Sequence, residues 1–247
     1  MSARHPFVLR ATLVAVLATS APASRAQSMP GGDMHSADGA MSGDMMPMAH
    51  MKMTTLGPAH AGDAVRAAAI ADTLRGAIEK YRNYHVALDE GFVIFMPKIP
   101  QRVYHFTSRP NAFRSIFSFD PARPTSLLYR KTGGGYTLVG AMFTAPNRYG
   151  PKDLDARVPL SMAEWHMHRN LCMPPKDREL ALYPSGDAPP LFGFQGSIAT
   201  DSACKAAGGR FHATVFGWMV HVSPWETDPA KVWGTHEDEE ERGATGH

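Results

Sequence analysis

The residues of this chain whose types and spacing could do chemistry begin at 165–172, which read Trp-His-Met-His-Arg-Asn-Leu-Cys. His166 and His168 stand two positions apart. Side chains on a β-strand alternate, so both imidazoles would lie on one face. On a helix the same pair would point about 200° apart and could not share an ion. Two neighbouring neutral imidazoles are half of a usual zinc or copper site. The spacing therefore predicts a metal-binding strand, and a ligand-free polar sheet face is the alternative.

A third histidine with matching alternation occurs in the segment 217–225. If this segment is a strand, its tryptophan and valines lie on one face and its histidine on the other. We therefore predict His221 as the third ligand, with His105 as the next candidate and His212 after it. The expected ion is copper or zinc, because imidazole binds both.

Two carboxylates flank the histidine strands, Glu164 and Glu226. Beside a metal with an open coordination position, such a group can act as a general base or as a fourth ligand. This would make the protein a metal-dependent hydrolase or oxygenase. A blue-copper site is not predicted, because Cys172 lacks a closely following histidine.

More candidate ligands lie upstream, in a segment that has no hydrophobic periodicity. Thioether sulfur is a soft ligand that suits Cu(I), and imidazole takes Cu(II). We interpret the segment as an auxiliary arm that collects copper, and a low-complexity linker is the alternative. Its expected ligands are Met34, His35, Met45, Met46, Met48, His50, Met51 and Met53.

The amino terminus is typical of an export signal. Residues 1–26 combine a positive end formed by Arg4 and Arg10, a short apolar run and a small-x-small cleavage site. The apolar run is far below the roughly 20 residues of a spanning helix, and no later segment is apolar enough to span. We expect a periplasmic or secreted protein without a membrane span in its mature chain. An uncleaved membrane anchor is the alternative.

The net charge and the cysteine content further restrict the class of protein to which this chain can belong. The full chain carries a formal charge of +2, and removal of residues 1–26 deletes three arginines and no acid, which leaves about −1. Such a chain has no basic field for nucleic acid. Two cysteines in an exported protein predict one disulfide, Cys172–Cys204, and a free Cys172 acting as a metal ligand is the alternative.

The elements that must position these residues form one expected domain, 59–233. Apolar residues recur at three- to four-residue steps over 61–89, which predicts one long amphipathic helix. Strand-like runs follow at 92–95, 103–106, 126–129, 136–144 and 211–225. We therefore predict an α+β fold, a long N-terminal helix followed by a mainly antiparallel sheet. The Met/His-rich segment 27–58 and the acidic tail 234–247 are expected to be disordered.

Several strings together resemble a family of exported bacterial proteins without an established activity. They are FDPARPTSLLY (119–129), LVG (138–140), WHMH (165–168) and GWMVH (217–221). The likeness extends over about 81–225 and implies a shared fold and site, but no function. The FDP turn is interpreted as architectural. The Met/His-rich segment is similar in composition to copper-handling segments of periplasmic proteins. The His-x-His strand is similar to cupins, but their fuller pattern is missing.

Together these features predict an exported protein that binds a transition metal, preferably copper, for periplasmic metal binding or tolerance. The expected ligands are His166, His168, His221 and His105. Two alternatives stay open: a metal-dependent hydrolase or oxygenase, and a metal-free envelope protein whose histidines are structural. The sequence indicates no protein partner.

Overall fold

The computed structural model describes residues 49–98, 101–176 and 190–234, which belong to one compact unit. The expected signal peptide (1–26) and all but the first residue of the acidic tail lie outside the described residues. Also outside them are the predicted arm ligands Met34, His35, Met45, Met46 and Met48. Within the described ranges, no helix is long and apolar enough to cross a bilayer.

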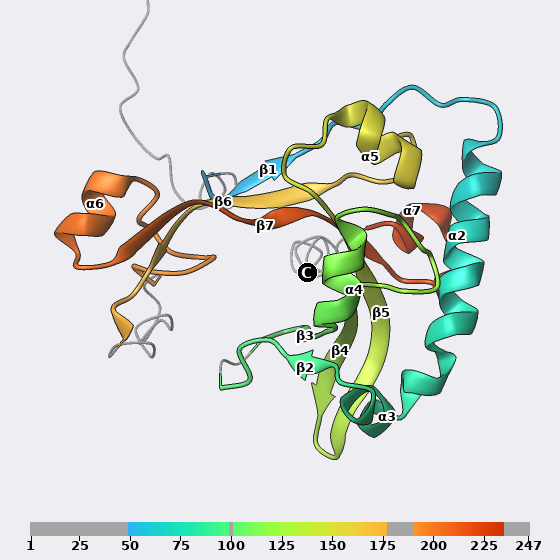
Figure 1. The fold of residues 1–247 in the computed structure, drawn as a ribbon, viewed down its shortest axis with the longest axis horizontal. Coiled ribbons are helices and arrows are strands. Elements are labelled where there is room, and N and C mark those ends of the chain that lie inside the picture. Colours follow the sequence, from blue (N-terminus) through green and yellow to red (C-terminus); the bar gives the residue numbers. More distant parts are fainter. Residues whose placement is uncertain (1–48, 99–100, 177–189, 235–247) are drawn as a thin grey trace, which may run out of the picture. The chain divides into compact units, whose positions relative to one another are not determined.

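A seven-stranded sheet dominates the described part of the chain, in the order β1-β6-β7-β5-β4-β3-β2 (Figure 1). All neighbouring strands pair antiparallel. The strands are β1 (Met51–Met53), β2 (Val93–Ile94), β3 (Tyr104–Thr107), β4 (Ser126–Thr132), β5 (Gly135–Ala145), β6 (His166–Met173) and β7 (Arg210–Val222). The longest, β5 and β7, lie side by side near its centre.

One face of the sheet carries the main hydrophobic core. Alternate residues of β5 and β7, such as Phe143, Val220 and Val222, are almost completely buried there. Leu74 and Ile78 of α2 (Asp63–Ile78) belong to the same cluster and have no exposed surface. Full burial of one such side chain contributes about 1.5–3 kcal/mol. This packing fixes the covered face, and the other face of the central strands carries a separate, smaller cluster of buried residues together with histidines.

The helices beyond α2 are short and connect or cover the strands (Figure 1). They are η1 (Glu79–Arg82), α3 (Tyr84–Asp89), α4 (Arg109–Ser115), α5 (Pro151–Arg157), α6 (Asp201–Ala206) and α7 (Pro229–Val232). Local signals start several of them. Ser108 caps α4 by accepting from the amide of Asn111, and Thr200 caps α6 by accepting from the amide of Ala203.

The predicted fold class, α+β with one long N-terminal helix, is wrong. The described residues form mainly an antiparallel sheet with short helices, and the region 61–89 is interrupted. α2 is 16 residues long and gives way to the 3₁₀ turn η1. Asn83 then adopts an extended conformation, and its side chain accepts from the amide of His85 to start α3. Apolar periodicity ran on through this break because both helices face the same core, whereas asparagine favours a cap over the helix interior.

The end of the segment that we expected to be disordered takes part in the sheet. Met51–Met53 form β1 and pair with β6. Thr54 continues the contact, because its amide donates to the carbonyl of Trp165 at 2.8 Å. The expected disordered segment 27–58 therefore does not extend over Met51–Met53. This three-residue strand is stabilised by pairing with β6, which local hydrophobicity does not reveal.

Gly217 is required at the end of the pairing between β5 and β7, where the two backbones lie close together. A Cβ at this position would lie 2.0 Å from the carbonyl oxygen of Ala145, a backbone atom of the neighbouring strand. We expect Gly217→Ala to lower the free energy of unfolding by about 2–3 kcal/mol, the cost of overpacking a rigid contact. Urea denaturation of the purified protein measures it.

Gly133, in the hairpin between β4 and β5, supplies the matched control. A Cβ there would meet nothing within 4 Å. Gly133→Ala should change stability by less than about 1 kcal/mol. Equal losses in the two variants would show that the β5–β7 crossing does not need a glycine.

Candidate metal centre

Four histidines meet on the face of the sheet opposite α2, which we name the histidine face. They are His105 on β3, His166 and His168 on β6, and His221 on β7. The ring centroids form a continuous series: His105 to His221 at 5.6 Å, His221 to His166 at 5.0 Å, and His166 to His168 at 5.6 Å. The four residues that the sequence singles out as ligands thus lie together in space, although they come from three strands.

The short distance between His105 and His221 requires a curved sheet. β3 and β7 are separated by β4 and β5. Neighbouring strands lie about 4.8 Å apart, so a flat sheet would separate the two residues by about 14 Å. The pairing of β4 with β5 shifts register between Leu128 and Tyr129, an irregularity that bends strands. In Figure 1, β6 and β7 extend from one end of the bent sheet and β2 and β3 from the other, on the side away from α2.

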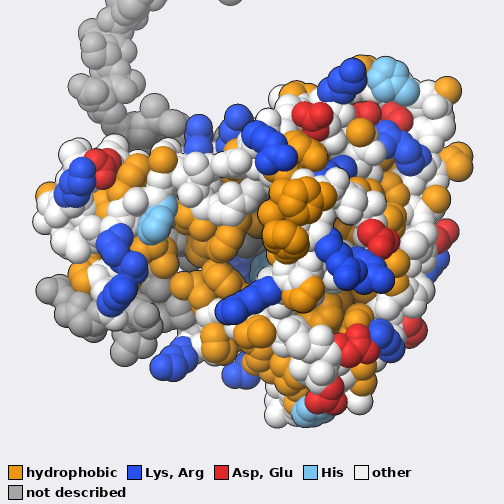
Figure 2. All heavy atoms as spheres, in the orientation of Figure 1, with side chains coloured by type: hydrophobic (Ala, Val, Ile, Leu, Met, Phe, Trp, Pro, Cys, Tyr) orange, Lys and Arg blue, Asp and Glu red, His pale blue; other side chains and the backbone are white. Residues whose placement is uncertain are grey.

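The surface is hollowed near this position. Figure 2 shows a recess close to the centre of the view, with hydrophobic side chains around it, and in the orientation of Figure 1 it lies between β7 and β3. An aromatic ring borders the histidines, because the ring centroid of Phe194 lies 4.7 Å from that of His168. Such an apolar ring lowers the local dielectric and strengthens any interaction with an ion.

Burial keeps the two β6 histidines in the neutral form. The pKa of His166 is lowered to about 3, mainly by desolvation and then by the neighbouring imidazoles of His168 and His105. The pKa of His168 is lowered to about 4, mainly by desolvation and then by His50. Both rings therefore carry a free lone pair at neutral pH, which is the state that binds a metal.

His166 holds a polar atom that its surroundings do not satisfy. The residue is only 4% exposed, and within the described residues its Nδ1 atom has no hydrogen-bond partner. Leaving a buried polar group unpaired costs about 1–3 kcal/mol, so such groups call for an explanation. An ion or another ligand on the histidine face would supply the missing partner.

The geometry does not complete a zinc-type ligand set. Among the described residues, no group of three or more His, Cys, Asp or Glu side chains is arranged to hold a metal ion. The predicted auxiliary carboxylates, Glu164 and Glu226, are exposed. His212, the last candidate for a third ligand, is exposed on β7 opposite Leu171. The four imidazoles are neighbours, but their convergence falls short of a closed site.

The carboxyl-terminal part of the predicted arm lies against the histidine strand. Met51 pairs with His168 and Met53 with His166. His50 is buried, with Nδ1 3.0 Å from the carbonyl oxygen of Asn170 and Nε2 2.5 Å from that of Gly196. Both ring nitrogens therefore lie within hydrogen-bond distance of backbone oxygens, and a ring N–H that donates to one of them anchors the arm.

The predicted disulfide is confirmed. Cys172, near the end of β6, is bonded to Cys204 of α6, with the two Cα atoms 5.5 Å apart. Both residues are fully buried beside Phe192 in a small cluster separate from the main core. The alternative of a free Cys172 acting as a metal ligand is thereby removed.

Two methionines of the histidine face were not predicted as site residues. Met142 of β5 lies opposite His221, and Met219 of β7 lies opposite His166. Both are buried and pack with Leu128. The alternation in 217–225 places Met219 beside His221 on a strand, but the pairing of β5 with β7, which brings in Met142, is not visible in local sequence.

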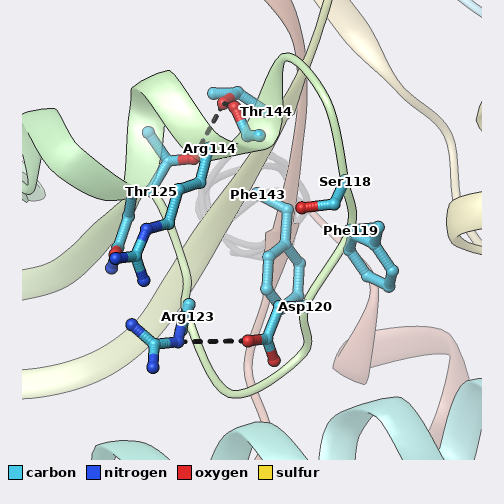
Figure 3. Close-up of a pocket in the computed structure, with 10 residues that line it drawn as sticks. Arg114, Ser118, Phe119, Asp120, Arg123, Thr125, Phe143 and Thr144 are labelled. Atoms are coloured by element: carbon cyan, nitrogen blue, oxygen red, sulfur yellow. Dashed lines mark hydrogen bonds and ion pairs between the residues drawn. The ribbon is translucent and has the colours of Figure 1, made fainter.

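A separate cavity of about 220 Å³ lies between α4 and β5 (Figure 3). Its lining includes Asp120 and Arg123, which form an ion pair with Nε 3.2 Å from Oδ2. Asp120 also accepts from the amide of Ala122 at 2.9 Å, which closes the turn of the FDP string. This contact supports an architectural role for FDP. The cavity shares no lining residue with the four histidines.

Comparison of the chain with protein-family models, with curated proteins and with solved structures finds no match in any of the three.

Proposed function

We propose that this protein is exported and binds a transition metal, copper, on the histidine face, for metal binding or tolerance in the periplasm. The observation that carries the proposal is the buried, neutral His166, whose Nδ1 atom has no hydrogen-bond partner among the described residues. Copper binding would turn an unsatisfied nitrogen into a coordinated one. Imidazole is a preferred ligand of copper in proteins.

Three further features support copper over a purely structural role for the histidines. The rings of His105, His168 and His221 lie in the same series as His166, at centroid distances of 5.0–5.6 Å. Imidazole rings grouped on one face offer several nitrogen ligands to a single ion, and imidazole suits copper. The Met/His-rich amino-terminal segment fits the same ion.

The proposal is limited to binding. A hydrolase would gain from a general acid or base beside the metal. The carboxylates considered for that role, Glu164 and Glu226, are exposed residues outside β6 and β7. No feature of the described residues favours catalysis over capture of the ion.

The decisive experiment is metal analysis of the protein isolated from its natural compartment. Wild type is compared with His166→Ala, with His212→Ala and with a chain lacking residues 27–48. We expect His166→Ala to lower copper affinity at least tenfold, because the His166 ring lies between those of His221 and His168 in the series. His212→Ala is the matched control, since His212 is exposed on the same sheet. Circular dichroism checks that each variant is folded.

The possible outcomes distinguish copper binding at the histidine face from copper binding by the Met/His-rich arm. Copper lost only on deletion of 27–48 would assign binding to the arm alone and overturn the proposal. Unchanged copper content in all three variants would overturn it as well and favour structural histidines. Loss in His166→Ala with retention in the deletion supports binding at the histidine face.

A further inference from the structure

We infer that the histidine face is a site for Cu(I), in which methionine thioethers placed by the sheet register complete the ligand set of the histidines. This inference rests on the proposed function and gives it an oxidation state and a set of soft ligands. It also assigns a structural part to the carboxyl-terminal end of the arm. The step is binding alone, and no electron is transferred.

The register places a methionine beside each histidine of β6 and beside His221 of β7. Met53 of β1, His166 of β6 and Met219 of β7 form one row across three strands. Met51 lies opposite His168, and Met142 opposite His221. Residues directly opposite in an antiparallel pair share a face, with Cβ atoms about 4.5–5.5 Å apart.

The intervening residues confirm which face these methionines occupy. Lys52, between Met51 and Met53, lies opposite Met167, and its Nζ atom is 5.2 Å from the ring of Trp218. Met167 and Trp218 belong to the main core on the other face. Alternation therefore directs Met51 and Met53 towards the histidines.

The chemistry of these ligands selects the ion. Among the described residues, no set of three or more His, Cys, Asp or Glu side chains can hold a metal, so a histidine-only centre is incomplete. Adding thioether sulfur changes the class of site, because thioethers are soft and favour Cu(I). Zinc and Cu(II) favour sets of nitrogen and oxygen ligands, and this face brings imidazoles together without arranging three of them around one ion in the described residues. Ag(I), a soft ion of the same charge, should bind in the same way.

The methionines of β1 are held in place from both ends. On one side, His50 contacts the carbonyl oxygens of Asn170 and Gly196, and Asn170 Nδ2 donates to the carbonyl of Ala49 at 3.1 Å. On the other side, Thr54 Oγ1 accepts from the amide of Trp165 at 2.9 Å. A flexible arm that collects copper would not need these contacts, whereas residues that form one side of a preformed site do.

A pair of matched methionine variants tests the inference. The double variant Met53→Leu/Met219→Leu removes the two sulfurs that flank His166 in its row. The single variant Met167→Leu removes one sulfur from β6, the strand of His166, on the opposite face of the sheet. Methionine and leucine are similar in volume, so these variants should stay folded. Cu(I) affinity is measured by competition with a chromophoric Cu(I) chelator under reducing, oxygen-free conditions, and Ag(I) binding by calorimetry.

We expect the double variant to lose at least tenfold in Cu(I) and Ag(I) affinity, and Met167→Leu to bind as wild type. X-ray absorption of the copper-loaded wild type should show sulfur neighbours that are weaker in the double variant. Wild-type Cu(I) affinity in the double variant, combined with loss in His166→Ala, would overturn the methionine ligands but leave the proposed function standing. Wild-type affinity in both variants would overturn both.

Discussion

Lowering the pH from 6.5 towards 4 is expected to destabilise the metal-free protein by up to about 3 kcal/mol per pH unit. The cause is the burial of two neutral imidazoles. The pKa of His166 is about 3 and that of His168 about 4 in the fold, against 6.5 for each in the unfolded chain. Between these values the unfolded state binds more protons, so acid favours it. Each histidine contributes about 1.4 kcal/mol per pH unit.

Both the direction of the stability change and the pH range in which it occurs follow from these pKa values. Above pH 6.5 neither state holds the protons, so stability should be flat there. The loss should begin as the pH falls below 6.5 and should level off near pH 4 for His168 and near pH 3 for His166. Urea unfolding in a chelator, at steps between pH 7.5 and 5.5, measures the slope before ordinary carboxylates, which titrate near about 4, begin to contribute.

A double variant isolates the two histidines. His166→Gln/His168→Gln should remove most of the slope between pH 6.5 and 5.5, although it lowers stability at pH 7.5. The exposed His212, changed to glutamine, should leave the wild-type slope in place. The same slope in the double variant as in wild type would show that these rings are not buried in the neutral form.

The shared face of His166, His168 and His221 was more predictable than the fold that surrounds these residues. Alternation on a strand is a local rule, so the spacing of His166 and His168 and the matching position of His221 could be read without knowing the topology. The proximity of His105 to His221 could not be predicted in this way. It depends on the order of four strands and on the curvature of the sheet, which local sequence does not encode.

The fold class failed for a related reason. Apolar periodicity over 61–89 reports which residues face the core, and it persists when a helix stops and another starts along the same face. Only Asn83 marks the interruption. β1 escaped detection because a three-residue strand among methionines has no pattern of its own and is stabilised by its partner β6. Pairing with β6 places Met51 and Met53, which belong to a segment of low complexity, directly opposite His168 and His166.

The disulfide should be the largest covalent contribution to stability in the described residues. Cys172 and Cys204 are 32 positions apart, and closing a loop of this size is worth about 3–4 kcal/mol in the chain-entropy model. We therefore expect Cys172→Ala/Cys204→Ala to lower the free energy of unfolding by about this amount. Urea unfolding of the oxidised wild type and of the double variant measures the difference.

The location of the bond also predicts what the double variant keeps. Cys172 and Cys204 pack with Phe192 in a satellite cluster, whereas Trp165 and Met167 bind β6 to the main core. The histidine face should therefore persist, so copper affinity should change little while stability falls. A reductant should destabilise wild type to the level of the variant and leave the variant unaffected. A copper affinity that falls in step with stability would instead mean that the bond at the end of β6 positions His166 and His168, and that the two clusters are not independent.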